Sequence, residues 1–317
     1  MGFAFVFPGQ GSQSVGMLGA LAGAEEQVRS TFAEASRVLG YDLWALVSDG
    51  PEAQLNATER TQPAMLAAGV ATWRVWRARG GAIPAVVSGH SLGEFTALVC
   101  AEALDFPTAI ALVRFRGQVM QEAVPEGSGA MAAILGLDDE PLAALCREAA
   151  QGGVVEPANF NSPGQTVIAG DAAAVSRAME AARARGAKRA LLLPVSVPSH
   201  SSLMRPAGER LRERLAGLAL RPPRIRYVSA VDARAHEDPG DIRELLVRQL
   251  SSPVRWTETL RALASGGIAQ VIECGPGKVL TGLNRRIERR PDLGFLALED
   301  PAAIAAALTA TQGAPHA

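Results

Sequence analysis

The chain has 317 residues, of which 48% are hydrophobic and 20% are charged, and its formal net charge is -1. This length and balance fit a compact protein with a large core, and they give no indication of nucleic acid as a partner. No apolar stretch reaches the length of a membrane span, and the cysteines, Cys100, Cys146 and Cys274, are too far apart for a metal motif or a disulfide framework, so we expect a reducing, cytoplasmic setting.

The first part of the chain predicts alternating strands and helices. An apolar strand over residues 3–7 leads into a glycine-rich turn, Pro8 to Gln13, whose backbone N–H groups can face an anion. Helices are expected at about 24–38, 64–76 and 106–121, and a strand at 84–88. Alternation of this kind favours a mainly parallel sheet covered by helices on both faces.

A G-x-S-x-G pattern, Gly89 to Gly93, lies between that last strand and an apolar helical segment that begins at Glu94. This order of strand, tight turn and helix is typical of a nucleophile elbow, in which the glycines allow a sharp turn and the serine hydroxyl is exposed. Ser91 would also lie at the amino end of a helix, which favours developing negative charge. We therefore predict a hydrolase-like α/β fold with Ser91 as nucleophile.

Residues 125–129 form a linker to a segment with a different order of elements. That order is strand, helix, strand, strand, helix, strand, at about 130–135, 139–150, 154–160, 166–169, 172–186 and 189–195. It is the ferredoxin-like order. We therefore expect a small α+β subdomain at 128–196, inserted into a large catalytic domain formed by 1–127 and 197–317.

The remainder returns to the large domain. Helices are expected at 203–216, 240–250, 278–289 and 301–310, strands at 225–229 and 270–274, and disorder over 311–317.

A serine hydroxyl needs a neighbouring base, and imidazole is the usual one near neutral pH. Of the four histidines, His316 lies in the tail, His236 lies in a polar loop, and His90 adjoins the serine, where neighbouring side chains diverge. His200 remains, at the end of an apolar segment, where the sites of parallel sheets collect. We expect His200 to accept the proton of Ser91, with an acylation rate that rises with pH through an apparent pKa of about 6.5.

Several segments together resemble the malonyl-CoA:acyl-carrier-protein transacylases of bacterial type II fatty-acid synthesis. They are Phe7–Gln13, Gly89–Glu94, Arg116–Gly117 with Met120–Gln121, Pro198–His200 and Gly275–Leu280. The resemblance covers about residues 3–290 and implies that Ser91 accepts a malonyl group from malonyl-CoA and passes it to the phosphopantetheine thiol of acyl carrier protein. We expect this reaction to need no metal or cofactor, and we expect a monomer. From the composition and the lack of a long apolar stretch we expect neither a nucleic-acid nor a membrane partner.

The resemblance further implies roles for individual residues around the serine. The N–H groups of Gln10 and Leu92 would form the oxyanion hole, and the main-chain carbonyl of Gln249 would orient His200.

Arg116 would bind the free carboxylate of the malonyl group through two parallel hydrogen bonds. Without the resemblance, Arg116 would be interpreted as a surface residue of an amphipathic helix, as Arg114 still is. Gln165, in the turn 161–165 of the small subdomain, is expected to face the cleft between the two domains as a second substrate-binding residue. A docking surface for carrier protein and the CoA phosphates is expected from four basic residues, Lys188, Arg189, Arg285 and Arg286.

Two other functions share these sequence features. A thioesterase would have the same elbow, and a non-catalytic carrier-binding subunit could retain the fold. The pocket's tolerance of methylmalonyl groups and the metabolic route that the carrier serves stay open.

Overall fold

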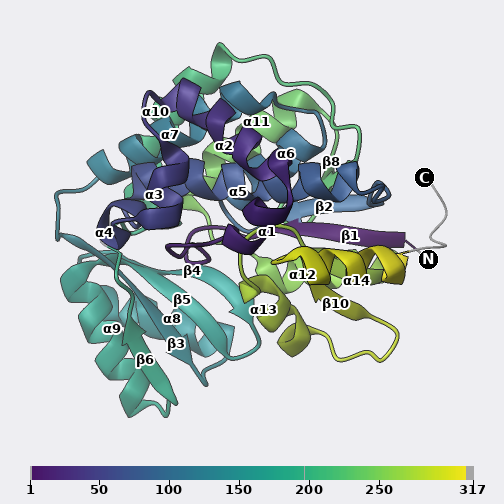
Figure 1. Cartoon of the computed structure of the whole chain (residues 1–317). Coiled ribbons are helices and arrows are strands. Elements are labelled where there is room, and N and C mark those ends of the chain that lie inside the picture. Colours follow the sequence, from purple (N-terminus) through teal and green to yellow (C-terminus); the bar gives the residue numbers. More distant parts are fainter. Residues whose placement is uncertain (1, 196, 312–317) are drawn as a thin grey trace.

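The computed structural model describes residues 2–195 and 197–311, which are organised around two sheets (Figure 1). The large sheet has the strand order β10-β9-β1-β2-β7-β8. All neighbouring strands in it are parallel except β7 and β8, which are antiparallel. Its strands are β1 (Gly2–Phe7), β2 (Val86–Gly89), β7 (Arg226–Val228), β8 (Ala235–His236), β9 (Ile268–Glu273) and β10 (Gly294–Ala297).

Alternate side chains of β1 pack into two different cores, one on each face of the large sheet. Phe3, Phe5 and Phe7 enter the first core, and Ala4 and Val6 enter the second. Because both faces are covered, the strand is apolar at every position and does not alternate with polar residues.

Most helices contribute to the first core. They are α1 (Gly19–Ala24), α2 (Glu26–Leu39), α3 (Leu43–Asp49), α4 (Glu52–Leu55), α5 (Thr58–Ala78), α6 (Gly93–Cys100), α7 (Phe106–Glu122), α10 (Arg205–Ala216), α11 (Pro239–Arg248) and α14 (Pro301–Thr311). The second core is covered by α12 (Trp256–Ser265) and α13 (Val279–Ile287). Two short 3-10 helices, η1 (Ser202–Met204) and η2 (Gln249–Ser251), lie in connections between these elements.

The small sheet is antiparallel and has the order β4-β5-β3-β6. Its elements are β3 (Gly129–Leu135), α8 (Asp139–Ala150), β4 (Val155–Ser162), β5 (Gln165–Asp171), α9 (Ala172–Ala184) and β6 (Arg189–Leu192). Both helices share one apolar core with the sheet. The predicted fold class, a mainly parallel α/β sheet with a ferredoxin-like α+β insertion, is thereby confirmed (Figure 1).

The limits predicted for the two domains stay a prediction. The strands and helices of the small sheet fall within 128–196, and Ser196, next to the second limit, lies outside the described residues.

Several element limits differ from those predicted. Helix α5 begins at Thr58 instead of Ala64, and Pro63 lies inside it. All residues from Thr61 to Val70 of α5 are buried, so packing overrides the local preference of proline against helix. Helix α12 and the edge strands β8 and β10 were not predicted. Of the predicted disordered tail, Thr311 ends α14, and 312–317 lie outside the described residues.

Candidate active site

Ser91 lies in a tight turn between β2 and α6, with a positive φ of 52°. The flanking glycines are required by close approach: a Cβ on Gly89 would lie 2.0 Å from the carbonyl carbon of Gly93, and a Cβ on Gly93 would lie 2.0 Å from the carbonyl oxygen of Phe7. A non-glycine residue in this conformation is strained, which is usual for the nucleophile of such an elbow.

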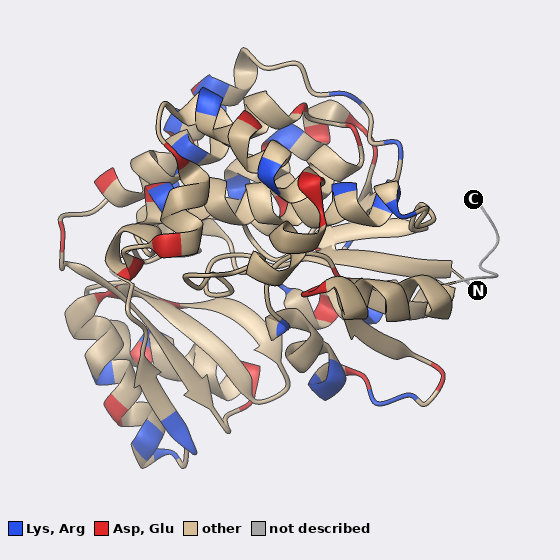
Figure 2. Ribbon diagram, in the orientation of Figure 1, with Lys and Arg blue, Asp and Glu red and all other residues tan. Residues whose placement is uncertain are grey.

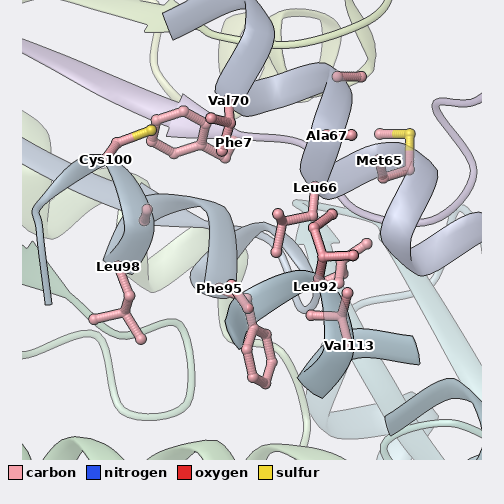
Figure 3. Packing of buried hydrophobic residues seen from close by; sticks show 14 of the residues in the cluster. Phe7, Met65, Leu66, Ala67, Val70, Leu92, Phe95, Leu98, Cys100 and Val113 are labelled. Carbon is pink, nitrogen blue, oxygen red and sulfur yellow. The ribbon is translucent and has the colours of Figure 1, made fainter. Parts of the chain in front are cut away.

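The start of α6 anchors the turn in the first core. Leu92 and Phe95 are buried in the same core as Leu66 of α5 and Val113 of α7, and the side chain of Leu92 lies near Leu66 and Val113 (Figure 3). Packing of this kind holds the backbone that carries Ser91, because a shift of the turn would open a cavity between three helices.

His200 is the histidine that the structure places beside Ser91. The Ser91 hydroxyl donates to Nε2 of His200 at 2.8 Å. On the other side of the ring, Nδ1 donates to the carbonyls of Gln249 at 2.7 Å and Ser252 at 3.2 Å. Since carbonyls only accept, Nδ1 carries the proton and Nε2 is free to take one from Ser91.

The pKa of His200 is lowered from its usual value of 6.5 to about 3. Burial of the ring is the main cause, and the nearby charge of Arg116 adds to it, while the Gln249 carbonyl acts in the opposite direction. The apparent pKa of about 6.5 expected from the sequence is therefore wrong for this buried ring. His200 is neutral, and so able to accept a proton, throughout the physiological range.

Arg116 is buried, with 1% of its surface exposed, and its guanidinium lies against Ser91. Its Nη2 donates to Ser91 Oγ at 3.3 Å and to Oε1 of Gln249 at 2.8 Å, and its Nη1 donates to Oε1 of Gln62 at 2.9 Å. Its Nε has no partner among the described residues. Arg114, two positions earlier and so on a different side of α7, instead donates to the carbonyl of Leu39.

Sequence reasoning missed three parts of this site. Gln62 is buried and accepts a hydrogen bond from Arg116, and it precedes the helix predicted at 64–76. Glu94 is buried at the start of α6 and was considered only as part of a motif. The side chain of Gln249, as opposed to its main-chain carbonyl, donates to the carbonyl of Ser91 at 2.9 Å. In the sequence, the only signal at these positions is an amide or carboxyl residue next to apolar residues.

The two positions expected to form the oxyanion hole lie at the same end of the large sheet. Leu92 precedes the first residue of α6, and Gln10 follows β1 closely. The His90 N–H donates to the carbonyl of Phe7, the last residue of β1, at 2.9 Å. The loop that carries Gln10 therefore leaves the sheet beside the elbow.

The remaining predicted residues lie around β5, β6 and α13. Oε1 of Gln165 accepts from Nη1 of Arg286 at 2.5 Å, so Gln165 joins the small sheet to α13 and has no described contact with Ser91. Lys188, Arg189, Arg285 and Arg286 are all exposed.

The described residues include no group of three or more His, Cys, Asp or Glu side chains arranged to hold a metal ion. Within the same ranges, every helix is too short or too polar to span a bilayer. All three cysteines are free and buried.

Comparison with known proteins extends over nearly the whole chain. The acyl transferase domain family matches residues 4–290. The malonyl CoA-acyl carrier protein transacylase of Salmonella typhimurium is 56% identical over 307 residues, which cover 97% of this chain and 99% of that protein. The enzyme of the same name from Bacillus subtilis is 43% identical over 306 residues, which cover 96% of each chain.

Solved structures agree with these relatives. An acyl carrier protein S-malonyltransferase from Vibrio cholerae has a TM-score of 0.93 and 57% identity, covering 97% of this chain and 100% of that one. A malonyl-transacylase in complex with its type II PKS acyl-carrier protein has a TM-score of 0.96 and 55% identity, covering 98% and 100%. This chain therefore belongs to the acyl transferase family, among the malonyl CoA-acyl carrier protein transacylases.

Proposed function

We propose that this chain transfers malonyl groups from malonyl-CoA to acyl carrier protein through a malonyl-Ser91 intermediate. The observation that carries the proposal is the surroundings of one oxygen atom: Ser91 Oγ lies 2.8 Å from Nε2 of His200 and 3.3 Å from Nη2 of Arg116. A simple serine esterase needs the nucleophile and the base. The buried guanidinium adds a group that suits a substrate with a free carboxylate.

In the first step, Ser91 Oγ attacks the thioester carbon of malonyl-CoA as its proton passes to Nε2 of His200. The oxyanion would be held by the N–H groups of Gln10 and Leu92, and such donors typically contribute about 3 kcal/mol each. When the tetrahedral intermediate collapses, the C–S bond breaks and the CoA sulfur takes the proton from His200. The carbonyl of Gln249 stabilises the imidazolium that forms in between.

In the second step the same groups act in reverse order. The phosphopantetheine thiol of the carrier gives its proton to His200 and attacks the acyl carbon, and Ser91 leaves as its hydroxyl is reprotonated. Ping-pong kinetics follow from the covalent intermediate. The reaction needs no metal or cofactor, and we propose a monomer that acts in the cytoplasm.

The proposed docking surface for the carrier consists of Lys188, Arg189, Arg285 and Arg286. Across three strands of the small sheet, Leu135 is in register with Arg189 on one side and with Gln165 on the other. Arg189 and Gln165 are therefore about 10 Å apart at the backbone, two strand spacings. Gln165 in turn contacts Arg286.

Through these contacts the basic residues of β6 lie on the same side of the molecule as those of α13, and both elements carry blue segments in Figure 2. Acyl carrier proteins are acidic, so a basic surface favours their approach.

Reversing the charges of Arg285 and Arg286 to glutamate is expected to raise the KM for carrier protein by roughly tenfold and to change the KM for malonyl-CoA much less, because charges at an interface rim act mainly on encounter. Steady-state kinetics with each substrate varied in turn measures both constants. The matched control is charge reversal of two other exposed arginines, Arg29 and Arg37 on α2. Equal effects on the two substrates would contradict the docking surface.

Acylation by malonyl-CoA is expected to be independent of pH between about 5 and 8, because a pKa of about 3 leaves His200 neutral over that range. Because the pKa of His200 is lowered, the ring becomes protonated and stops acting as a base only when the pH falls through about 3. Stopped-flow measurement of kcat/KM for acylation reports the free enzyme. The His200→Ala variant should be slow at every pH, and a wild-type rate that rises around pH 6.5 would contradict the buried, neutral ring.

Intact-protein mass spectrometry after mixing with malonyl-CoA tests the proposed function against its alternatives. A transferase keeps one malonyl group on Ser91 until carrier protein is added and then loses it to the carrier. A thioesterase releases malonate without a carrier, and a non-catalytic subunit never gains the mass. Either of those results would refute the proposal.

A further inference from the structure

Glu94 is a buried carboxylate for which the two-step reaction has no use. It has 1% of its surface exposed, and its two carboxylate oxygens act as hydrogen-bond acceptors. Tyr227 Oη and Ser229 Oγ donate to its Oε2, the latter at 2.9 Å, while Ala230 N and Gln249 Nε2 donate to its Oε1 at 3.3 and 3.0 Å. The N–H of Ala230 and the amide group of Gln249 can only donate, so these two contacts favour the charged form of Glu94 and oppose the burial that raises its pKa.

The amide of Gln249 separates this charge from the guanidinium of Arg116. Its Nε2 is occupied by two acceptors, Glu94 Oε1 at 3.0 Å and the carbonyl of Ser91 at 2.9 Å. Its Oε1 must therefore face the other way, where it accepts from Arg116 at 2.8 Å. Because the His200 contact uses the main-chain carbonyl of the same residue, the side chain is free for this second function.

Arg116 has no direct anionic partner among the described residues. Its hydrogen-bond acceptors are the amides of Gln62 and Gln249 and the hydroxyl of Ser91, all of them neutral. Burial lowers the pKa of Arg116 to about 10, and the charge of Glu94 opposes that change. An unpaired buried cation is strongly unfavourable, so a nearby negative charge has a physical role.

We propose that Glu94 is the counter-charge of Arg116, held one amide away by Gln249 so that the guanidinium stays available to the carboxylate of the acyl group. A direct ion pair would stabilise the empty site but would compete with the substrate. A separated one stabilises Arg116 in the free enzyme and weakens its hold on the malonyl carboxylate, which assists release to the carrier. This inference rests on the proposed role of Arg116.

The test is the affinity of malonyl-CoA and acetyl-CoA for Glu94→Gln in a Ser91→Ala background, where no acyl transfer occurs, measured by isothermal titration calorimetry. The new amide can keep the network, because the Tyr227 and Ser229 hydroxyls can accept as well as donate. Only the charge is removed.

Malonyl-CoA is expected to bind about tenfold more tightly, since a unit charge several ångströms away has an effect of this order at an effective dielectric near 20. Acetyl-CoA, which shares the CoA phosphates but lacks the carboxylate, should bind as before. Unchanged or weaker malonyl-CoA binding would overturn the inference, and a purely structural role would not produce selective tightening.

The matched control is Glu273→Gln, which removes another fully buried carboxylate. Glu273 ends β9 and accepts from the N–H groups of Leu280 at 3.0 Å and Thr281 at 2.7 Å. Neither affinity should change in this variant. The same selective tightening here would show that any buried charge has the effect, which also overturns the inference.

Two further variants keep the proposal testable if Glu94→Gln does not fold. Gln62→Glu puts a carboxylate directly on Arg116, so malonyl-CoA alone should bind more weakly, and an unchanged affinity would count against the proposal. Arg116→Ala should remove the preference for malonyl-CoA over acetyl-CoA. If that preference survives, the carboxylate site itself is misassigned, a failure of the proposed function that is distinct from a failure of Glu94 alone.

Discussion

Ser91→Ala is expected to lower malonyl transfer by about 10⁶-fold, the order of loss that follows removal of the nucleophile from a serine–histidine pair. Without Oγ there is no atom to carry the acyl group, and His200 has no proton to accept. The measurement is single-turnover transfer from radiolabelled malonyl-CoA to carrier protein, together with the intact mass of the variant. The variant should still bind both substrates, because the alanine removes one small polar group.

The control for this experiment is Ser88→Ala, three positions earlier in β2. Ser88 is fully buried, and its hydroxyl has no hydrogen-bond partner among the described residues. Removing an unsatisfied hydroxyl is close to neutral for stability, so transfer should be retained. A malonyl adduct on the Ser91→Ala protein, or loss of activity in the Ser88→Ala protein alone, would show that the nucleophile lies elsewhere.

Arg116→Ala is expected to reduce acylation by malonyl-CoA by about 10²- to 10⁴-fold, since charge-assisted hydrogen bonds contribute about 1.5–3 kcal/mol each and two are lost. Acylation by acetyl-CoA, which lacks the carboxylate, should change little or rise. The ratio of the two acylation rates, measured in parallel by mass spectrometry, separates selectivity from general damage to the site.

Two substitutions sharpen this result. Arg116→Lys keeps the charge but cannot form the two parallel bonds, so it should recover only part of the malonyl preference. Arg114→Ala, on the same helix, removes a guanidinium that contacts the carbonyl of Leu39 and should leave both acylation rates unchanged. The proposed carboxylate site would be wrong if Arg116→Ala and Arg116→Lys each reduced acylation by malonyl-CoA and by acetyl-CoA in the same proportion.

The positions that the sequence identified are those whose chemistry depends on local backbone. The spacing of Gly89, Ser91 and Gly93 predicts the turn, because only glycine fits the close approaches at its two ends. The end of an apolar segment indicated His200, and the family resemblance pointed to Arg116 and to the Gln249 carbonyl. The turn that carries Ser91 and most of the strands and helices could therefore be predicted from the amino-acid sequence, whereas α12, β8 and β10 could not.

Only the tertiary structure decided which buried groups, distant in the sequence, form hydrogen bonds with each other. Gln249 and Glu94 are 155 positions apart, and Arg116 and Gln62 are 54 apart, so no local pattern links them. The same holds for the pKa of His200, which depends on how completely the fold removes the ring from water and on the charge placed beside it. Local sequence determines where the backbone turns. Burial, hydrogen-bond partners and the field at a buried atom arise only when the chain is packed together, because each depends on residues from several elements at once.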